Sequence, residues 1–181
     1  MIDNLTLSTD KIRLRALEPE DVALLYRWEN DPDVWLISNT LAPYSKYTLT
    51  EFVNASLQDL YTAKQLRLMI VNQKDNATVG ILDIFEFDPY HLRAGIGILI
   101  EKPYRRQGFA EGTISLAIKY LFTHIHLHQI FCNVMSHNTS SIALFKKAGF
   151  QEVGCKKEWI RTPNGFEDEI TMQLINTNNP Q

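Results

Sequence analysis

The sequence predicts a fold of the α/β or α+β class. Segments with the pattern of strands and segments with the pattern of helices alternate along most of its 181 residues. One helix is well marked, because apolar residues recur at three- and four-residue intervals from 114 to 122. With 45% hydrophobic residues, the chain is long enough to bury one sizeable core. We therefore expect a single domain over residues 1–181.

The N-terminal part predicts one strand followed by helices. Residues 11–17 alternate as a first strand, and Pro19 opens a helix with acidic residues in its first turn. Segment 31–49 contains two prolines and is expected to be irregular, and a helix is expected over residues 50–63. The inner face of the first helix is expected to hold Val22, Leu25 and Tyr26.

Strands dominate from residue 66 onwards. Residues 72–77 are turn formers between two strand patterns and predict a hairpin. A long helix follows the central strand, a short helix precedes the last two strands, and the polar tail 176–181 is expected to fray. The expected strands are residues 66–71, 78–87, 93–100, 129–135, 151–160 and 166–174.

An apolar strand ending at residue 100 runs into a short turn and then directly into the long helix. The N–H groups at a helix N-terminus attract anions, and two arginines lie beside this one. Gly108 has no Cβ, so the backbone there can approach a bulky anion closely. The sequence therefore predicts a diphosphate site formed by Arg105, Arg106, Gln107, Gly108, Phe109 and Ala110.

A second segment, residues 138–150, predicts a short helix between two strands. Asn138 is a good N-terminal cap, Gly149 is a good C-terminal stop, and lysines occupy the last turn.

Together the two segments resemble the GNAT superfamily of acetyl-CoA-dependent N-acetyltransferases. The resemblance rests on the Arg-x-x-Gly-x-Ala run at 105–110, and on Asn-x-x-Ser at 138–141 with the Gly-Phe at 149–150. Over residues 80–110 and 138–150 the chain looks closest to the spermidine/spermine N-acetyltransferases.

The resemblance implies a mixed, mostly antiparallel sheet of about seven strands, splayed at its centre, with helices on both faces. It implies acetyl-CoA as co-substrate and no metal. The pantetheine arm would pair with the backbone of Ile98, Leu99 and Ile100. Beyond the diphosphate turn, it adds Asn138, Ser141, Phe145 and Lys147 to the residues expected to bind the coenzyme.

The expected chemistry is direct attack of the amine on the thioester, with the Leu99 N–H as oxyanion donor. Many relatives place a tyrosine acid where this chain has Phe145, which cannot donate a proton. Two interpretations follow. Either Phe145 is a core residue and water protonates the thiolate, or the Ser141 hydroxyl, one turn earlier, acts as the acid.

The general base is expected to be a carboxylate acting through ordered water. Glu86 lies in a strand that leads to the site, and Glu158 begins a segment resembling the base-bearing strand of ribosomal-protein acetyltransferases. Spermidine acetyltransferases carry a glutamate on the central strand where this chain has Gly95. A carboxylate base at that position is therefore excluded.

The acceptor class stays open at this stage. A polyamine needs several carboxylates, and Asp83, Glu86 and Asp88 could supply them, but loop 34–47 carries none. Ser141 and Glu158 favour instead the N-terminus of a protein, such as a ribosomal protein. A third alternative is a non-catalytic acyl-CoA-binding sensor.

The remaining features favour a cytoplasmic enzyme. The net charge of −3 argues against nucleic-acid and anionic-membrane partners. Cys132 and Cys155 are expected to be reduced packing residues, and residues 1–4 do not resemble a signal peptide. The histidines at 124–128 end a helix, where such residues are common, so no metal is expected there. Exposed aromatic residues and the resemblance favour a homo-oligomer, dimer or larger.

Overall fold

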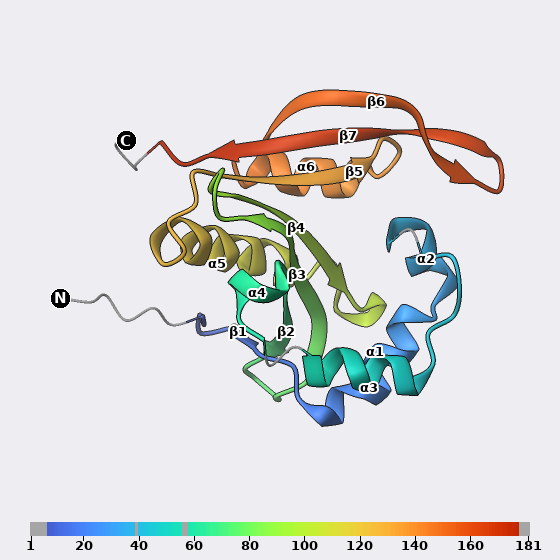
Figure 1. The fold of residues 1–181 in the computed structure, drawn as a ribbon, viewed down its shortest axis with the longest axis vertical. Coiled ribbons are helices and arrows are strands. Elements are labelled where there is room, and N and C mark those ends of the chain that lie inside the picture. The colour runs from blue at the N-terminus through green and yellow to red at the C-terminus, as the bar shows by residue number, and fades with distance from the viewer. Residues whose placement is uncertain (1–6, 39, 56–57, 178–181) are drawn as a thin grey trace.

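A seven-stranded sheet runs through the part of the molecule that the structure describes, residues 7–38, 40–55 and 58–177 of a computed structural model (Figure 1). Two predictions concern residues outside this part: that residues 1–4 do not resemble a signal peptide, and that the end of the polar tail, 178–181, frays. The strand order is β1-β2-β3-β4-β5-β7-β6. The strands are β1 (Ile12–Arg15), β2 (Leu66–Asn72), β3 (Thr78–Asp88), β4 (Arg93–Ile100), β5 (Gln129–Met135), β6 (Gln151–Thr162) and β7 (Gly165–Ile175).

Helices connect the strands and cover the sheet. They are the 3-10 turns η1 (Pro19–Asp21) and η2 (Lys102–Tyr104) and the helices α1 (Val22–Glu29), α2 (Pro32–Ser38), α3 (Lys46–Ala55), α4 (Leu60–Ala63), α5 (Phe109–Thr123) and α6 (Thr139–Lys147).

The sheet is splayed between its two central strands, as expected. Every neighbouring pair is antiparallel except β4 and β5, which run parallel. Their last pair joins Gly95 to Phe131, although β4 continues to Ile100 and β5 to Met135. A gap between the strands therefore opens beyond this pair.

Helices lie on both faces of the sheet (Figure 1). Alternate residues of β3 point to opposite faces. Leu82 packs in a core cluster with Phe109 and Leu116 of α5. Ile81, its neighbour, packs instead with α1 and α3. The predicted stripe on α5 is confirmed, because Ile114, Ala117 and Leu121 are buried and Ile118 and Phe122 pack against the same core.

The prediction that residues 31–49 are irregular is wrong for α2 and for the start of α3, and it holds for residues 40–45. Pro32 is the first residue of α2, where a helix tolerates proline because the missing N–H has no helical partner. The Asp31 carboxylate accepts a hydrogen bond from the Asp33 N–H at 3.0 Å, and the Ser45 hydroxyl accepts one from the Thr48 N–H at 3.0 Å. These side chains support the starts of α2 and α3. Residue 39 lies outside the described residues.

The helix predicted over residues 50–63 is two helices, α3 and α4. Asp59 caps the second, accepting hydrogen bonds from the backbone N–H groups of Tyr61 and Thr62 at 2.8 and 3.1 Å. Residues 56–57 are outside the described part of the chain.

Two predictions about packing are also corrected. Tyr26 was expected on the inner face of the first helix, but it is 39% exposed. Trp28 of the same helix is buried together with Leu25. Cys132 is buried, but Cys155 is exposed because most of the edge strand β6 faces solvent. Both cysteines are free. Among the described helices, none combines the length and the apolar character that crossing a membrane requires.

Candidate functional site

The gap between β4 and β5 leaves one edge of the β4 backbone available. The Glu101 N–H donates to the Val79 carbonyl of β3 at 2.9 Å, and an antiparallel ladder repeats every two residues. The Leu99 N–H therefore points to β3, and the backbone groups of Ile98 and Ile100 point into the gap. Arg105 agrees with this alternation, because its Nε donates to the Ile100 carbonyl at 2.9 Å. The geometry argues against Leu99 as oxyanion donor and favours the Ile98 N–H.

The turn after β4 has the backbone of an anion site. Arg106 and Gly108 both adopt the left-handed region, with φ of +58° and +82°. Gly108 is the N-cap of α5, and the space where a Cβ would stand is open except for the Lys11 Nζ 3.8 Å away. Turns of this kind direct successive N–H groups to one side, and the α5 dipole adds positive potential there. This arrangement agrees with the predicted diphosphate site.

Two side chains of the turn face solvent, and the others support the turn or are at least partly buried. Arg105 and Arg106 are exposed at the surface. Gln107 donates from its side chain to the Pro103 carbonyl at 2.8 Å, which braces the turn. Phe109 is buried edge-on against Tyr104, so only its backbone can face an anion. Ala110 is half-buried.

Sequence reasoning missed Lys11 at this turn. Its ammonium donates to the Gln107 carbonyl and lies over the Phe109 ring, 4.8 Å from the centroid. No local signal could have found it, because 96 residues separate the two partners. Lys11 secures the outer side of the turn.

The short helix α6 and its cap hold four residues that the resemblance adds to the expected coenzyme site. Asn138 is its cap, and the side-chain oxygen accepts a hydrogen bond from the Ser141 N–H at 3.1 Å. Ser141 is half-buried, and its hydroxyl has no partner among the described residues. Phe145 is 4% exposed and packs edge-on against Phe150, which agrees with the first of its two interpretations, a core residue. Lys147 pairs with Glu111 of α5 at 2.8 Å.

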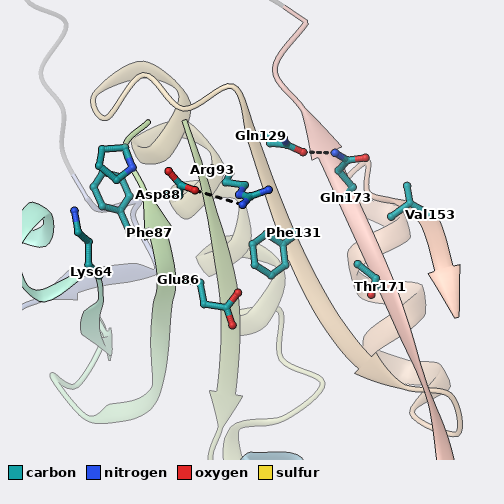
Figure 2. A pocket seen from close by; sticks show the side chains of 11 residues that line it. Lys64, Glu86, Phe87, Asp88, Arg93, Gln129, Phe131, Val153, Thr171 and Gln173 are labelled. Atoms are coloured by element: carbon teal, nitrogen blue, oxygen red, sulfur yellow. Dashed lines mark hydrogen bonds and ion pairs between the residues drawn. The ribbon is translucent and has the colours of Figure 1, made fainter. Parts of the chain in front are cut away.

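A pocket of about 800 Å³ lies over the paired ends of β4 and β5 (Figure 2). The gap begins just beyond this pocket, at the Gly95–Phe131 pair, which we call the apex. We call the pocket the apical pocket. It takes its walls from the exit of β3, the start of β4 and β5, and the neighbouring parts of β6 and β7. Phe131, which pairs with Gly95 at the last β4–β5 step, is one wall. The lining residues are Lys64, Glu86, Phe87, Asp88, Pro89, Arg93, Gln129, Phe131, Val153, Thr171 and Gln173.

Glu86 enters this pocket because β3 is irregular there. The β3–β4 register shifts between Phe85 and Asp88, and Glu86 has a φ of +49°, which a non-glycine residue adopts rarely. The bulge leaves Glu86 exposed in the pocket and turns Phe87 into the core. Strained backbone of this kind is often kept at functional sites.

The position of Gly95 is covered by an aromatic ring. A Cβ at Gly95 would overlap the ring of Phe85, which in turn packs edge-on against Phe131 with centroids 5.9 Å apart. The two rings span β3, β4 and β5 next to the apex of the gap. The sequence excluded a carboxylate at this position, and the structure shows what fills it.

The other predicted acidic residues are elsewhere or already engaged. Asp83 forms two hydrogen bonds with Arg67, at 2.6 and 2.9 Å, and Arg67 also binds Glu29. Burial alone would lower the pKa of Arg67, but these two carboxylates raise it. Glu158 lies further along β6 and is not part of the pocket wall. The structure therefore brings Glu86, and not Glu158, to the apex.

Several pocket residues were missed from the sequence. Gln129 and Phe131 alternate with buried residues of β5, so their shared face was readable, but their neighbours on β7 were not. Gln173 contacts Gln129, and the Thr171 hydroxyl donates to Asn133 at 3.0 Å.

The chain matches known acetyltransferases over most of its length. Residues 11–151 match the model of the acetyltransferase (GNAT) domain. The chain is 25% identical over 169 residues to the spermidine N(1)-acetyltransferase of Vibrio cholerae, covering 91% of this chain and 93% of the relative. It is 28% identical over 151 residues to the spermidine N(1)-acetyltransferase of Escherichia coli K12, covering 81% and 76% of the two chains.

A solved structure shares the fold. The spermidine N-acetyltransferase of Vibrio cholerae in complex with CoA and spermine aligns with a TM-score of 0.83 at 24% identity, covering 92% of this chain and 96% of that one.

Proposed function

The chain belongs to the GNAT family of acetyltransferases, and from that premise we propose that it transfers acetyl from acetyl-CoA to a primary amine held in the apical pocket. The coenzyme would place its diphosphate on the turn at 105–110. Its pantetheine arm would follow the free edge of β4 and bring the thioester to the apex of the gap. The amine would arrive from the pocket, on the other side of the apex.

The chemical problem for such an enzyme is proton removal from the amine. An alkylammonium with a pKa of about 10.4 is neutral in only about one molecule in a few thousand at pH 7. Glu86 lines the pocket beside the last β4–β5 pair, where a carboxylate can receive the proton directly or through one water.

Formation and collapse of the tetrahedral intermediate each use a further group. The Ile98 N–H, directed into the gap, would stabilise the oxyanion as the amine adds to the thioester. The departing thiolate, with a thiol-like pKa near 8.5, needs a proton less urgently than the amine needs to lose one. Water or the Ser141 hydroxyl would supply it, because Phe145 has no proton to donate.

One observation carries the proposal: the pocket with Glu86 in its wall meets the splayed strands at the last pair they form. Two acceptor classes remain from the sequence, polyamines and peptide N-termini. The similarity to spermidine acetyltransferases supports the first.

The proposed base is tested by paired variants in an assay of free thiol release. The amine panel contains short monoamines, spermidine, aminoglycosides and short peptides. Glu86→Gln is expected to lower kcat/KM for the accepted amine about a hundredfold or more, because it removes a general base. Affinity for acetyl-CoA, measured by calorimetry, should stay unchanged.

Glu158→Gln is the matched control, since it makes the same chemical change outside the pocket. It should retain activity close to that of the unmodified protein. Loss of activity in Glu158→Gln alone would move the base to β6. Binding of acetyl-CoA without turnover of any amine would instead support the acyl-CoA-binding sensor.

We also propose a single folded domain that assembles as a homo-oligomer in the cytoplasm. β6 is an edge strand that exposes Trp159, and Phe166 at the start of β7 is exposed on the same hairpin. Apolar side chains gathered on such an edge suit contact with a second copy of the chain.

A further inference from the structure

The apical pocket is not an acidic site. Among its lining residues, two are carboxylates, Glu86 and Asp88, and two are cations, Lys64 and Arg93. The remaining polar lining consists of neutral amides and a hydroxyl, from Gln129, Thr171 and Gln173. The formal charges of the wall therefore cancel.

One of the two carboxylates is already committed to the fold. Asp88 accepts hydrogen bonds from the backbone N–H groups of Tyr90 and His91 at 3.1 and 2.9 Å, which close the β3–β4 turn. It also pairs with Arg93. Glu86 makes no ion pair with any described residue, so it is the carboxylate left for a ligand's ammonium group.

The side chains of the two cations, Arg93 and Lys64, form fewer hydrogen bonds and ion pairs with described residues than the Asp88 carboxylate does. The Arg93 guanidinium is 48% exposed, and among the described residues its one ion-pair partner is Asp88, at a long 3.3 Å. A guanidinium has five N–H donors arranged in a fork, so most of its capacity to bind an anion is unused. The Lys64 ammonium lies 5.8 Å from the centroid of the Phe87 ring and forms no ion pair within the described part of the chain.

The spacing of these groups follows from the strand. Arg93 stands two residues before Gly95, the β4 residue at the apex, and a strand rises about 3.3 Å per residue. Arg93 therefore starts about 7 Å from the apex, on the same strand. Figure 2 shows its side chain and that of Glu86 by the Phe131 ring.

We infer that the acceptor is a small zwitterionic amine, in which an anionic group lies a few bonds from the amine to be acetylated. The ammonium pairs with Glu86 and the anionic group with Arg93, assisted by Lys64. This inference rests on the proposed function and names the substrate class for the same site. The lining therefore points away from the polyamine that the similarity to spermidine acetyltransferases supports, because the second ammonium of a polyamine would meet Arg93 or Lys64 where it needs a carboxylate.

A series of ω-amino acids tests the inference against matched amines. The series is glycine, β-alanine, 4-aminobutyrate and 6-aminohexanoate, with n-butylamine, 4-aminobutyramide and spermidine as comparisons. We expect at least one amino acid to exceed n-butylamine and the amide in kcat/KM by about ten- to hundredfold, as for hydrogen bonds to a charged group. The chain length with the highest kcat/KM reports the distance between the two sites.

Arg93 is then probed directly. Arg93→Gln should abolish the preference for the amino acid over n-butylamine, and Arg93→Lys should restore part of it, because a point charge remains. Arg161→Gln makes the same change on the exposed hairpin of β6 and should leave the preference intact. Thermal unfolding and acetyl-CoA affinity of each variant separate loss of fold from loss of recognition.

The outcomes distinguish this inference from the proposed function. Turnover in which n-butylamine or spermidine equals or exceeds every amino acid would overturn the inference and leave the acetyltransferase standing. An unchanged preference in a folded Arg93→Gln protein would overturn the role of Arg93. Coenzyme binding without turnover of any amine would overturn both.

Discussion

Gly95 shows how one residue without a side chain shapes the apex. The Phe85 ring occupies the space above it and reaches Phe131 across the strand. A side chain at residue 95 would have to displace the ring, so glycine here is required by packing and not by backbone torsion.

We expect Gly95→Ala to lower the free energy of unfolding by about 1–3 kcal/mol, the usual cost of overpacking. Gly97→Ala is the control, because its new methyl would meet the Phe85 ring at an ordinary 3.7 Å. Urea denaturation of the two variants measures the difference.

A double variant checks the cause. Gly95→Ala combined with Phe85→Leu should be less destabilised than the sum of the two single changes, because the shorter side chain removes the overlap. Additive effects would show that the ring is not the obstacle.

Residues near in sequence were predicted more reliably than residues that meet across the sheet. The turn at 105–110 carries its own signal, since the glycine, the arginines and the helix start lie within six residues. Arg93, Phe131 and Gln173 come from three strands. Strand order, which local pattern does not encode, brings them together.

At the scale of elements, one ion pair links α5 and α6 beside the proposed coenzyme site. Lys147, which the resemblance adds to the residues expected to bind the coenzyme, pairs with Glu111 in the first turn of α5. Both side chains are at least half exposed. We interpret the pair as neutralising a carboxylate beside the proposed diphosphate site.

Lys147→Met should therefore raise the KM for acetyl-CoA about two- to fivefold, equivalent to about 0.3–1 kcal/mol near a helix N-terminus. The uncompensated Glu111 carboxylate would repel the diphosphate. Adding Glu111→Gln should return the KM to its original value. A double variant that still binds weakly would show that Lys147 touches the coenzyme itself.

The elements differ in how well they could be predicted. β5 has the predicted bounds, because alternating burial and a clear end after Met135 define it locally. α2 was missed because Pro32 was interpreted as a helix breaker, although a helix tolerates proline in its first turn, where Pro32 lies. The bulge at Glu86 was equally invisible, since it depends on the register with β4.

At the scale of the whole molecule, a partly buried ion pair joins β1 to η1, and the same arginine also reaches β3. Arg15 of β1 holds Asp21 of η1 through hydrogen bonds of 2.6 and 2.8 Å and reaches Thr78 of β3 at 3.2 Å. Burial alone would raise the pKa of Asp21, but the bonds from Arg15 and the Glu18 N–H lower it below its ordinary value.

This pair predicts a pH dependence of stability. Because the folded pKa of Asp21 lies below the unfolded value of about 3.9, the carboxylate stabilises the fold above that pH and loses the effect as pH falls through the folded pKa. Asp21→Asn should cost about 1–3 kcal/mol at pH 7. The difference between the two proteins, measured by urea denaturation, should shrink below about pH 4. A constant difference down to pH 2 would contradict this assignment.

The short parallel ladder between β4 and β5 divides the sheet into two antiparallel halves. Only three pairs of described residues join the halves within the sheet, and the chain that connects β4 to β5 passes through α5. A ligand that lies between β4 and β5 and contacts both halves would bind the folded protein and not the unfolded one. Its binding would therefore raise the free energy of unfolding as its concentration rises above Kd.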